Sequence, residues 1–114
     1  MSQDCLFCKF ASKEIPTKIA YEDDKVLAFH DIHPQAPVHV LIIPKKHYDS
    51  VADVPPGDTI VADVTEGALK VANKLGIAQD GFRLVVNTRK FGGQVIFHFH
   101  MHLLGGRSMS PPMG

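Results

Sequence analysis

The sequence has no net charge and no long apolar run. Its 12 Lys and Arg residues balance its 12 Asp and Glu residues, which counts against a general nucleic-acid binder, because such proteins neutralise phosphates with a basic surface. No apolar stretch reaches the about 18 residues that a membrane-spanning helix needs. The first residues also lack the basic and apolar regions of a secretory signal. We therefore expect a cytoplasmic protein with neither a nucleic acid nor a membrane as its partner.

Cysteine is scarce, and its two copies, Cys5 and Cys8, form a C-x-x-C pair. Because thiols stay reduced in the cytosol, a structural disulfide is not expected. A redox pair and one half of a metal site are both open interpretations of this spacing.

Length and composition indicate one folded domain, residues 1–114. Hydrophobic residues make up 45% of the chain and charged residues 21%, both close to the averages for globular proteins. A chain of this length is expected to bury roughly two-thirds of the surface that its unfolded form exposes. That is enough for a core without added cross-links.

The expected elements are several neighbouring strands and few helices. Apolar residues at helical spacing predict a long helix that starts near Asp58 or Thr59 and ends at Gly76, where glycine suits a left-handed cap. A short helix is expected over residues 5–12, and strands over 18–21, 26–30, 38–43, 82–87 and 96–104. This order predicts an α+β fold with a mostly antiparallel five-stranded sheet, one long helix and one short helix.

Three of the seven histidines, His98, His100 and His102, alternate with apolar residues. The period is that of a β-strand, so the three side chains should share one face. The residues expected on the other face, as core, are Phe97, Phe99, Met101 and Leu103. At about 3.3 Å per residue, the backbones of His98 and His102 are roughly 13 Å apart, so one metal ion cannot easily hold all three. We expect the three histidines to divide their tasks.

With these residues the chain resembles the histidine triad (HIT) family, whose signature is His-φ-His-φ-His-φ-φ, where φ is apolar; it is complete in residues 98–104. The chain is most similar to the Hint branch of adenosine phosphoramidases. The other segments that carry the resemblance are 13–16, 21–24, 27–32, 34–37, 43–47, 92–94 and 104–107. The resemblance implies a homodimer of α+β subunits that binds purine nucleoside monophosphates and hydrolyses AMP phosphoramidates.

The resemblance also implies roles for individual histidines. The middle residue, His100, attacks the α-phosphorus and forms a transient nucleotidyl-histidine that water then hydrolyses. His102 supports the phosphate and the leaving group. His39, on the expected strand 38–43, orients and polarises the nucleophile. This is chemically reasonable, because an imidazole with one nitrogen engaged by a partner presents the other as a nucleophile.

Further positions match the family's substrate contacts. Asn87, Gly93, Gln94 and Val95 match positions around the phosphate, where glycine lets backbone N–H groups approach an anionic oxygen. Asp31 matches the residue that accepts hydrogen bonds from the ribose hydroxyls. The residues that match the apolar pocket for the base are Leu6, Phe7, Phe10, Phe29, Ile32 and Leu41.

Cys5, Cys8, His47 and His98 match a zinc-binding set found in some HIT proteins. Two thiolates and two imidazoles make a closed tetrahedral site of the structural type. Such a site would tie the N-terminal segment to the end of the expected strand 38–43. The alternatives are a pair of cysteines without metal and a thioredoxin-like redox motif, although the βαβ context of that motif is absent from the pattern.

Two other functions fit these residues. One is the hydrolysis of dinucleoside polyphosphates, the related chemistry of the fragile-histidine-triad branch; turnover of AMP phosphoramidates against diadenosine substrates distinguishes the two. The other is a purine-nucleotide-binding interaction module with little turnover, which would bind AMP tightly without cleaving its conjugates.

Val95 departs from the family, which usually has serine at this position, where the hydroxyl helps the bridging or leaving-group atom. Valine has no side-chain donor, so we expect slow phosphoramidate cleavage or a shifted leaving-group preference. The substitution Val95→Ser should raise the rate of AMP phosphoramidate cleavage in a single-turnover assay. An unchanged rate would refute this explanation.

Overall fold

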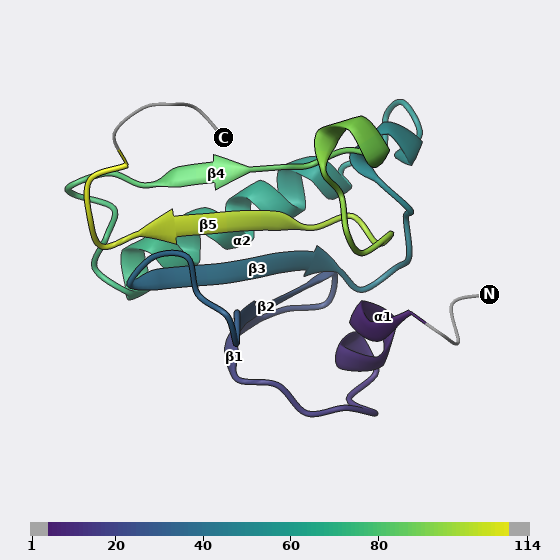
Figure 1. Cartoon of the computed structure of the whole chain (residues 1–114). Helices are drawn as coiled ribbons and strands as arrows, with labels where there is room; N and C mark the ends of the chain where they lie inside the picture. Colours follow the sequence, from purple (N-terminus) through teal and green to yellow (C-terminus); the bar gives the residue numbers. More distant parts are fainter. Residues whose placement is uncertain (1–4, 110–114) are drawn as a thin grey trace.

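The computed structural model describes residues 5–109, which form an antiparallel sheet of five strands and two α-helices (Figure 1). The strands are β1 (Ile19–Glu22), β2 (Val26–His30), β3 (Val38–Pro44), β4 (Arg83–Val85) and β5 (Met101–Gly105), and they pair in the order β1-β2-β3-β5-β4. The helices are α1 (Leu6–Ala11) and α2 (Ile60–Lys74), and two short 3-10 turns are η1 (Val51–Asp53) and η2 (Lys90–Gly92). The expected α+β class, antiparallel sheet and pair of helices are confirmed.

Helix α2 covers one face of the sheet and forms the larger core with it (Figure 1). Its apolar side packs against Val40, Ile42 and Leu103, all of them fully buried. At the start of α2, the Asp58 side chain accepts the N–H of Ile60, the first residue of the helix, at 2.9 Å. Gly76 follows the end of the helix with a φ of +75°. Both expected ends are therefore confirmed. Within residues 5–109, no helix is long and apolar enough to cross a membrane.

Helix α1 lies against the other face, where it forms a smaller core. Phe7 of α1 packs against Phe29 of β2 and Leu41 of β3. Side chains alternate along a strand, so residues on this face include His39 of β3 and His102 of β5, next to the apolar residues that face α1. The sheet therefore separates a face covered by α2 from a face that carries histidines.

Strand β5 begins at Met101, five residues later than the expected strand 96–104. Its ladder with β3 ends at the pair Ile42–Met101. Pro44, two residues further along β3, has no N–H to donate, and its carbonyl oxygen accepts the Nε2–H of His98 at 2.8 Å. The ladder cannot continue, so His98 and His100 lie on a segment that precedes the sheet.

The four apolar residues that alternate with the histidines are not all buried. Phe99, Met101 and Leu103 lie in the core with α2, as expected. Phe97 was expected there too, but it is 54% exposed. Both Phe97 and Phe99 precede β5, so the alternation of a strand does not determine which of the two is buried. The N–H of Phe99 donates to the carbonyl of Tyr48 at 2.7 Å instead of to β3.

Candidate active site

The three histidines of the triad lie in three different surroundings. His98 is fully buried and contacts the two cysteines and His47. His100 packs its ring against Phe7 at a centroid distance of 5.1 Å. His102 contacts His39. No single metal-ligand group found within residues 5–109 contains all three, which agrees with the expectation that one metal ion does not hold them together.

The hydrogen bond of His100 determines which of its ring nitrogens can react. Its Nδ1 lies 2.8 Å from the carbonyl oxygen of His98, and a carbonyl can only accept, so Nδ1 carries the hydrogen. Burial lowers the pKa of His100, against a smaller rise from this hydrogen bond. The ring is therefore neutral at pH 7 and has its lone pair on Nε2, which is the arrangement of a nitrogen nucleophile.

A chain of hydrogen bonds fixes the hydrogen on His102. The backbone N–H of Gln35 donates to Nδ1 of His39 at 3.0 Å, so the hydrogen of His39 is on Nε2. That nitrogen lies 2.9 Å from Nδ1 of His102 and donates to it, which leaves the hydrogen of His102 on its own Nε2. The direct partner of His39 is thus His102, whereas the family resemblance implied that His39 would orient the nucleophile.

Burial keeps both of these rings neutral. It lowers the pKa of His39, which the charge of Asp31 raises by less. Burial, followed by the charges of His100 and His39, lowers the pKa of His102 to about 4. At pH 7 the Nε2–H of His102 can therefore donate a hydrogen bond, for example to a phosphate oxygen or a leaving group.

Asp31 and Asn87 lie next to this pair. The Oδ2 atom of Asp31 is 3.5 Å from Nε2 of His39, and its Oδ1 atom accepts the backbone N–H of His33 at 2.8 Å. Asn87 shares a cavity of about 370 Å³ with His39 and His102. Both predicted contact residues are thus brought close to the histidines.

The residues predicted to contact the base are divided between core and surface. Phe7, Phe29 and Leu41 are buried together in the core under α1, and the ring of Phe7 connects this cluster to His100. Ile32 is 84% exposed. The structure therefore provides an apolar wall beside His100, with Ile32 outside it.

The loop between β4 and β5 contains the other predicted phosphate contacts. Gly93 ends η2 with a φ of +81° and donates its N–H to Lys90 at 3.1 Å, and Gln94 donates its N–H to Arg89 at 3.0 Å. These two N–H groups are therefore used inside the loop. Val95 follows them and is 83% exposed.

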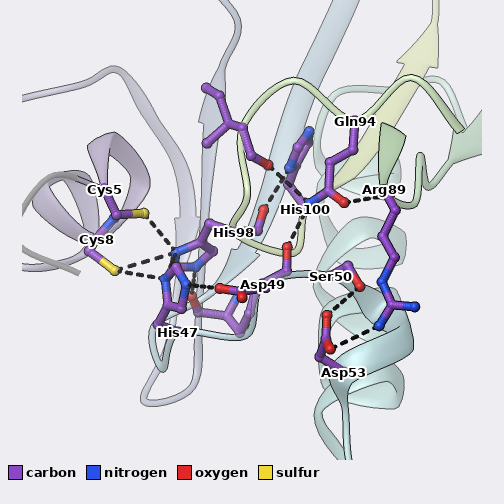
Figure 2. Close-up of polar contacts among 12 residues, drawn as sticks. Cys5, Cys8, His47, Asp49, Ser50, Asp53, Arg89, Gln94, His98 and His100 are labelled. Carbon is purple, nitrogen blue, oxygen red and sulfur yellow. Dashed lines mark hydrogen bonds and ion pairs between the residues drawn. The ribbon is translucent and has the colours of Figure 1, made fainter. Parts of the chain in front are cut away.

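Cys5, Cys8, His47 and His98 form a compact cluster at the N-terminal end of α1 (Figure 2). The Sγ atom of Cys5 lies 3.3 Å from Nδ1 of His98. The Sγ atom of Cys8 lies 3.3 Å from Nδ1 of His47 and 3.4 Å from Nδ1 of His98. All four predicted metal ligands are thus brought together, although their sequence spacing alone was a weak signal.

The outer nitrogens of the two histidines show what the cluster can hold. Nε2 of His98 donates to the carbonyl of Pro44 at 2.8 Å, and Nε2 of His47 donates to a carboxylate oxygen of Asp49 at 2.7 Å. Both Nδ1 lone pairs therefore point inward, 3.1 Å apart, and would repel each other without a cation between them.

These distances fit a tetrahedral metal ion. With metal–ligand bonds of about 2.0–2.3 Å, the edges of such a site measure roughly 3.3–3.8 Å, near the separations seen here. Asp49 was not identified from the sequence. The only available signal was its position two residues after His47, in a turn.

The chain matches known proteins over nearly its whole length. A family model described as the HIT domain matches residues 12–109. The chain is 46% identical over 112 residues to the purine nucleoside phosphoramidase of Escherichia coli K12, and the match covers 97% of this chain and 94% of that protein.

Two solved structures extend the similarity to three dimensions. A histidine triad protein from Clostridium difficile superimposes with a TM-score of 0.94 at 45% identity, over 97% of both chains. A Zn-bound histidine triad family protein from Mycobacterium smegmatis does so with a TM-score of 0.83 at 32% identity, over 96% of this chain and 79% of the other.

The buried neutral histidines predict that acid weakens the fold. In the unfolded chain, His39 and His102 bind protons below about pH 6.5, whereas folded His102 does so only below about pH 4. Between these values the unfolded state binds more protons, so the free energy of unfolding should fall as the pH is lowered from 6.5 to 4. Urea unfolding at a series of pH values, with a chelator present throughout, measures this slope.

The slope should be shallower in His102→Gln, which cannot bind the proton in either state. His33 is exposed, so His33→Gln is the matched control and should keep the slope of the wild type. An equal slope in His102→Gln and the wild type would contradict the prediction.

Proposed function

Because the chain belongs to the HIT domain family, we propose that it hydrolyses the phosphorus–nitrogen bond of purine nucleoside 5′-monophosphoramidates through a covalent nucleotidyl-histidine. One observation carries this proposal: the hydrogen bond from Nδ1 of His100 to the His98 carbonyl, which leaves the Nε2 lone pair available. The phosphoramidase activity named for the Escherichia coli relative supports the substrate class.

In the proposed first step, Nε2 of His100 forms a bond to the α-phosphorus while the phosphorus–nitrogen bond of the substrate breaks. The leaving amine takes the electron pair and a proton from water, and the Nε2–H of His102 would donate a hydrogen bond to the leaving group or a phosphate oxygen as charge develops there. In the second step, water attacks the phosphorus, the bond to His100 breaks and the nucleoside monophosphate leaves.

The remaining predicted residues take supporting roles in this proposal. His39 is a positioning residue, since its hydrogen bond fixes the tautomer of His102. The Asp31 carboxylate would accept hydrogen bonds from the ribose hydroxyls, and Asn87 would contact the phosphate side of the substrate. The apolar wall of Phe7, Phe29 and Leu41, together with Ile32, would contact the base. Gly93, Gln94 and Val95 belong to the loop that would border the phosphate.

We also propose that Cys5, Cys8, His47 and His98 hold a structural Zn²⁺ ion. The inward lone pairs of the two histidines and the presence of a Zn-bound relative support this choice of ligand. When bound, the ion supplies a cross-link and takes no part in the reaction, because four protein ligands leave no open position for a substrate. It would tie α1 to the segments that carry His47 and His98.

We further propose that the protein is a homodimer. Strand β4 is at one edge of the sheet. An edge strand presents unpaired backbone groups that a second copy of the chain can cover.

Replacing the nucleophile tests the proposed function. Turnover of an AMP phosphoramidate should fall by at least about 10³-fold in His100→Ala, because removing a nucleophile abolishes the covalent route. His33→Ala, at an exposed position, should keep wild-type turnover, and circular dichroism should show that both variants fold. Mass spectrometry should trap a nucleotidyl adduct on wild-type protein only.

Two results would contradict the proposal. Equal, negligible turnover by the wild type and His100→Ala, with AMP still bound by the wild type, would favour an interaction module. Faster cleavage of diadenosine polyphosphates than of AMP phosphoramidates would favour the other hydrolase branch.

Metal analysis tests the proposed zinc site. The purified protein should contain about one Zn²⁺ per chain, and Cys8→Ala should lose it and unfold at a lower temperature, since structural zinc contributes directly to stability. The matched control is Ser12→Ala, outside the cluster, which should retain the metal. Zinc retained unchanged by Cys8→Ala would remove these ligands from consideration.

A further inference from the structure

Arg89, in the loop between β4 and β5, has a backbone conformation that residues with side chains rarely adopt. Its φ is 60° and its ψ is −171°, a region occupied almost only by glycine. Within residues 5–109, Lys13 is the other non-glycine residue with a positive φ. Such a conformation persists only where surrounding contacts hold it.

Gln94 supplies the buried contacts that hold Arg89 (Figure 2). The Oε1 atom of Gln94 accepts the backbone N–H of Arg89 at 2.7 Å, and the backbone N–H of Gln94 donates to the carbonyl of Arg89 at 3.0 Å. The guanidinium of Arg89 also pairs with Asp53 at 3.0 Å, but these side chains are 62% and 40% exposed, so this ion pair contributes little.

The Gln94 side chain also connects the loop to two other segments. The Nε2 atom of Gln94 donates to the carbonyl of Asp49 at 2.6 Å and to the carbonyl of Ile96 at 3.0 Å. Both N–H bonds of the amide are therefore used. Gln94 is only 6% exposed, so its side chain is a buried connection between three stretches of backbone.

Through Ile96, this connection reaches the proposed nucleophile. The carbonyl of Ile96 that accepts from Gln94 also accepts the backbone N–H of His98 at 2.9 Å. The carbonyl of His98 then accepts Nδ1 of His100. Residues 96–100 precede β5 and have no strand ladder. These hydrogen bonds therefore help to determine where the segment lies, together with the bond from the Phe99 N–H to the Tyr48 carbonyl and that from His98 to the Pro44 carbonyl.

We infer that Gln94 is a positioning residue for the proposed reaction: its buried amide holds the strained turn at Arg89 and fixes the segment that carries His100. This inference rests on the proposed function. Gln94 acts through the protein, whereas the family resemblance implied that it would contact the phosphate. Its amide has no N–H left to donate to a substrate.

The test compares Gln94→Met, which keeps the length of the side chain without its polar atoms, with Gln94→Asn, which keeps the amide but is too short to reach the same partners. For AMP phosphoramidate hydrolysis, kcat should fall roughly tenfold to a hundredfold in both, as for a misplaced reacting group, while KM changes little. Limited trypsin digestion should cut both variants after Arg89 or Lys90 faster than it cuts the wild type.

The matched control is Asp53→Asn, which removes the exposed ion pair of Arg89 and leaves the buried contacts in place. Its kcat and its resistance to trypsin should both stay close to those of the wild type. Circular dichroism should show all three variants folded at the assay temperature.

Two outcomes would overturn the inference. In one, the Gln94 variants keep wild-type kcat and a protected loop. In the other, KM rises while kcat and loop protection are unchanged, which would mean that Gln94 contacts the substrate directly.

Failure of the proposed function itself would appear differently, as an absence of turnover by the wild type. The Nδ1–H proton of His100 then gives the decisive signal by NMR. Its exchange with water should be faster in Gln94→Met than in the wild type, and equal exchange would overturn the inference.

Discussion

A neutral imidazole carries one hydrogen on one of its two nitrogens, and the chemistry of the site depends on where the backbone places that hydrogen. The carbonyl of Pro44 fixes it on Nε2 of His98, and the carbonyl of His98 fixes it on Nδ1 of His100. For His102, the backbone N–H of Gln35 donates to His39, and His39 donates to Nδ1 of His102, so the hydrogen of His102 is on Nε2. Histidines that are neighbours in the sequence thus differ in which nitrogen is available, and this difference suits them to the proposed roles of ligand, nucleophile and donor.

Pro44 influences both the fold and the site. It cannot donate to a strand ladder, so β5 starts at Met101 and the residues before it are free to turn toward other partners. One of those partners is the Pro44 carbonyl itself, which accepts from His98. The end of β3 at Pro44 therefore separates His98, which joins the cluster with Cys5, Cys8 and His47, from the residues of β5 that remain in the sheet.

Periodicity in the sequence predicted the elements that bury one face and expose the other. The long helix follows from its apolar spacing, and the facing of Met101 and Leu103 follows from strict alternation. Periodicity does not report whether a neighbouring strand is available, so the exposure of Phe97 and the late start of β5 were missed. The family resemblance predicted the residues of the site, but the pairing of His39 with His102 and the buried contacts of Gln94 depend on distances that no spacing encodes.

The contact between α1 and the triad has a consequence for how the protein is made. Cys5 and His98 are 93 positions apart, and Phe7 meets His100 across a similar span. Closing so long a loop costs more conformational entropy than forming local contacts, so such contacts tend to form late in folding. During synthesis, the partners of α1 on β2 and β3 emerge early, but its partners on the triad segment emerge only near the end of the chain. A nascent chain, or one truncated before the triad, can therefore form the apolar wall of Phe7, Phe29 and Leu41 but lacks His98 and His100, so the proposed site is completed last.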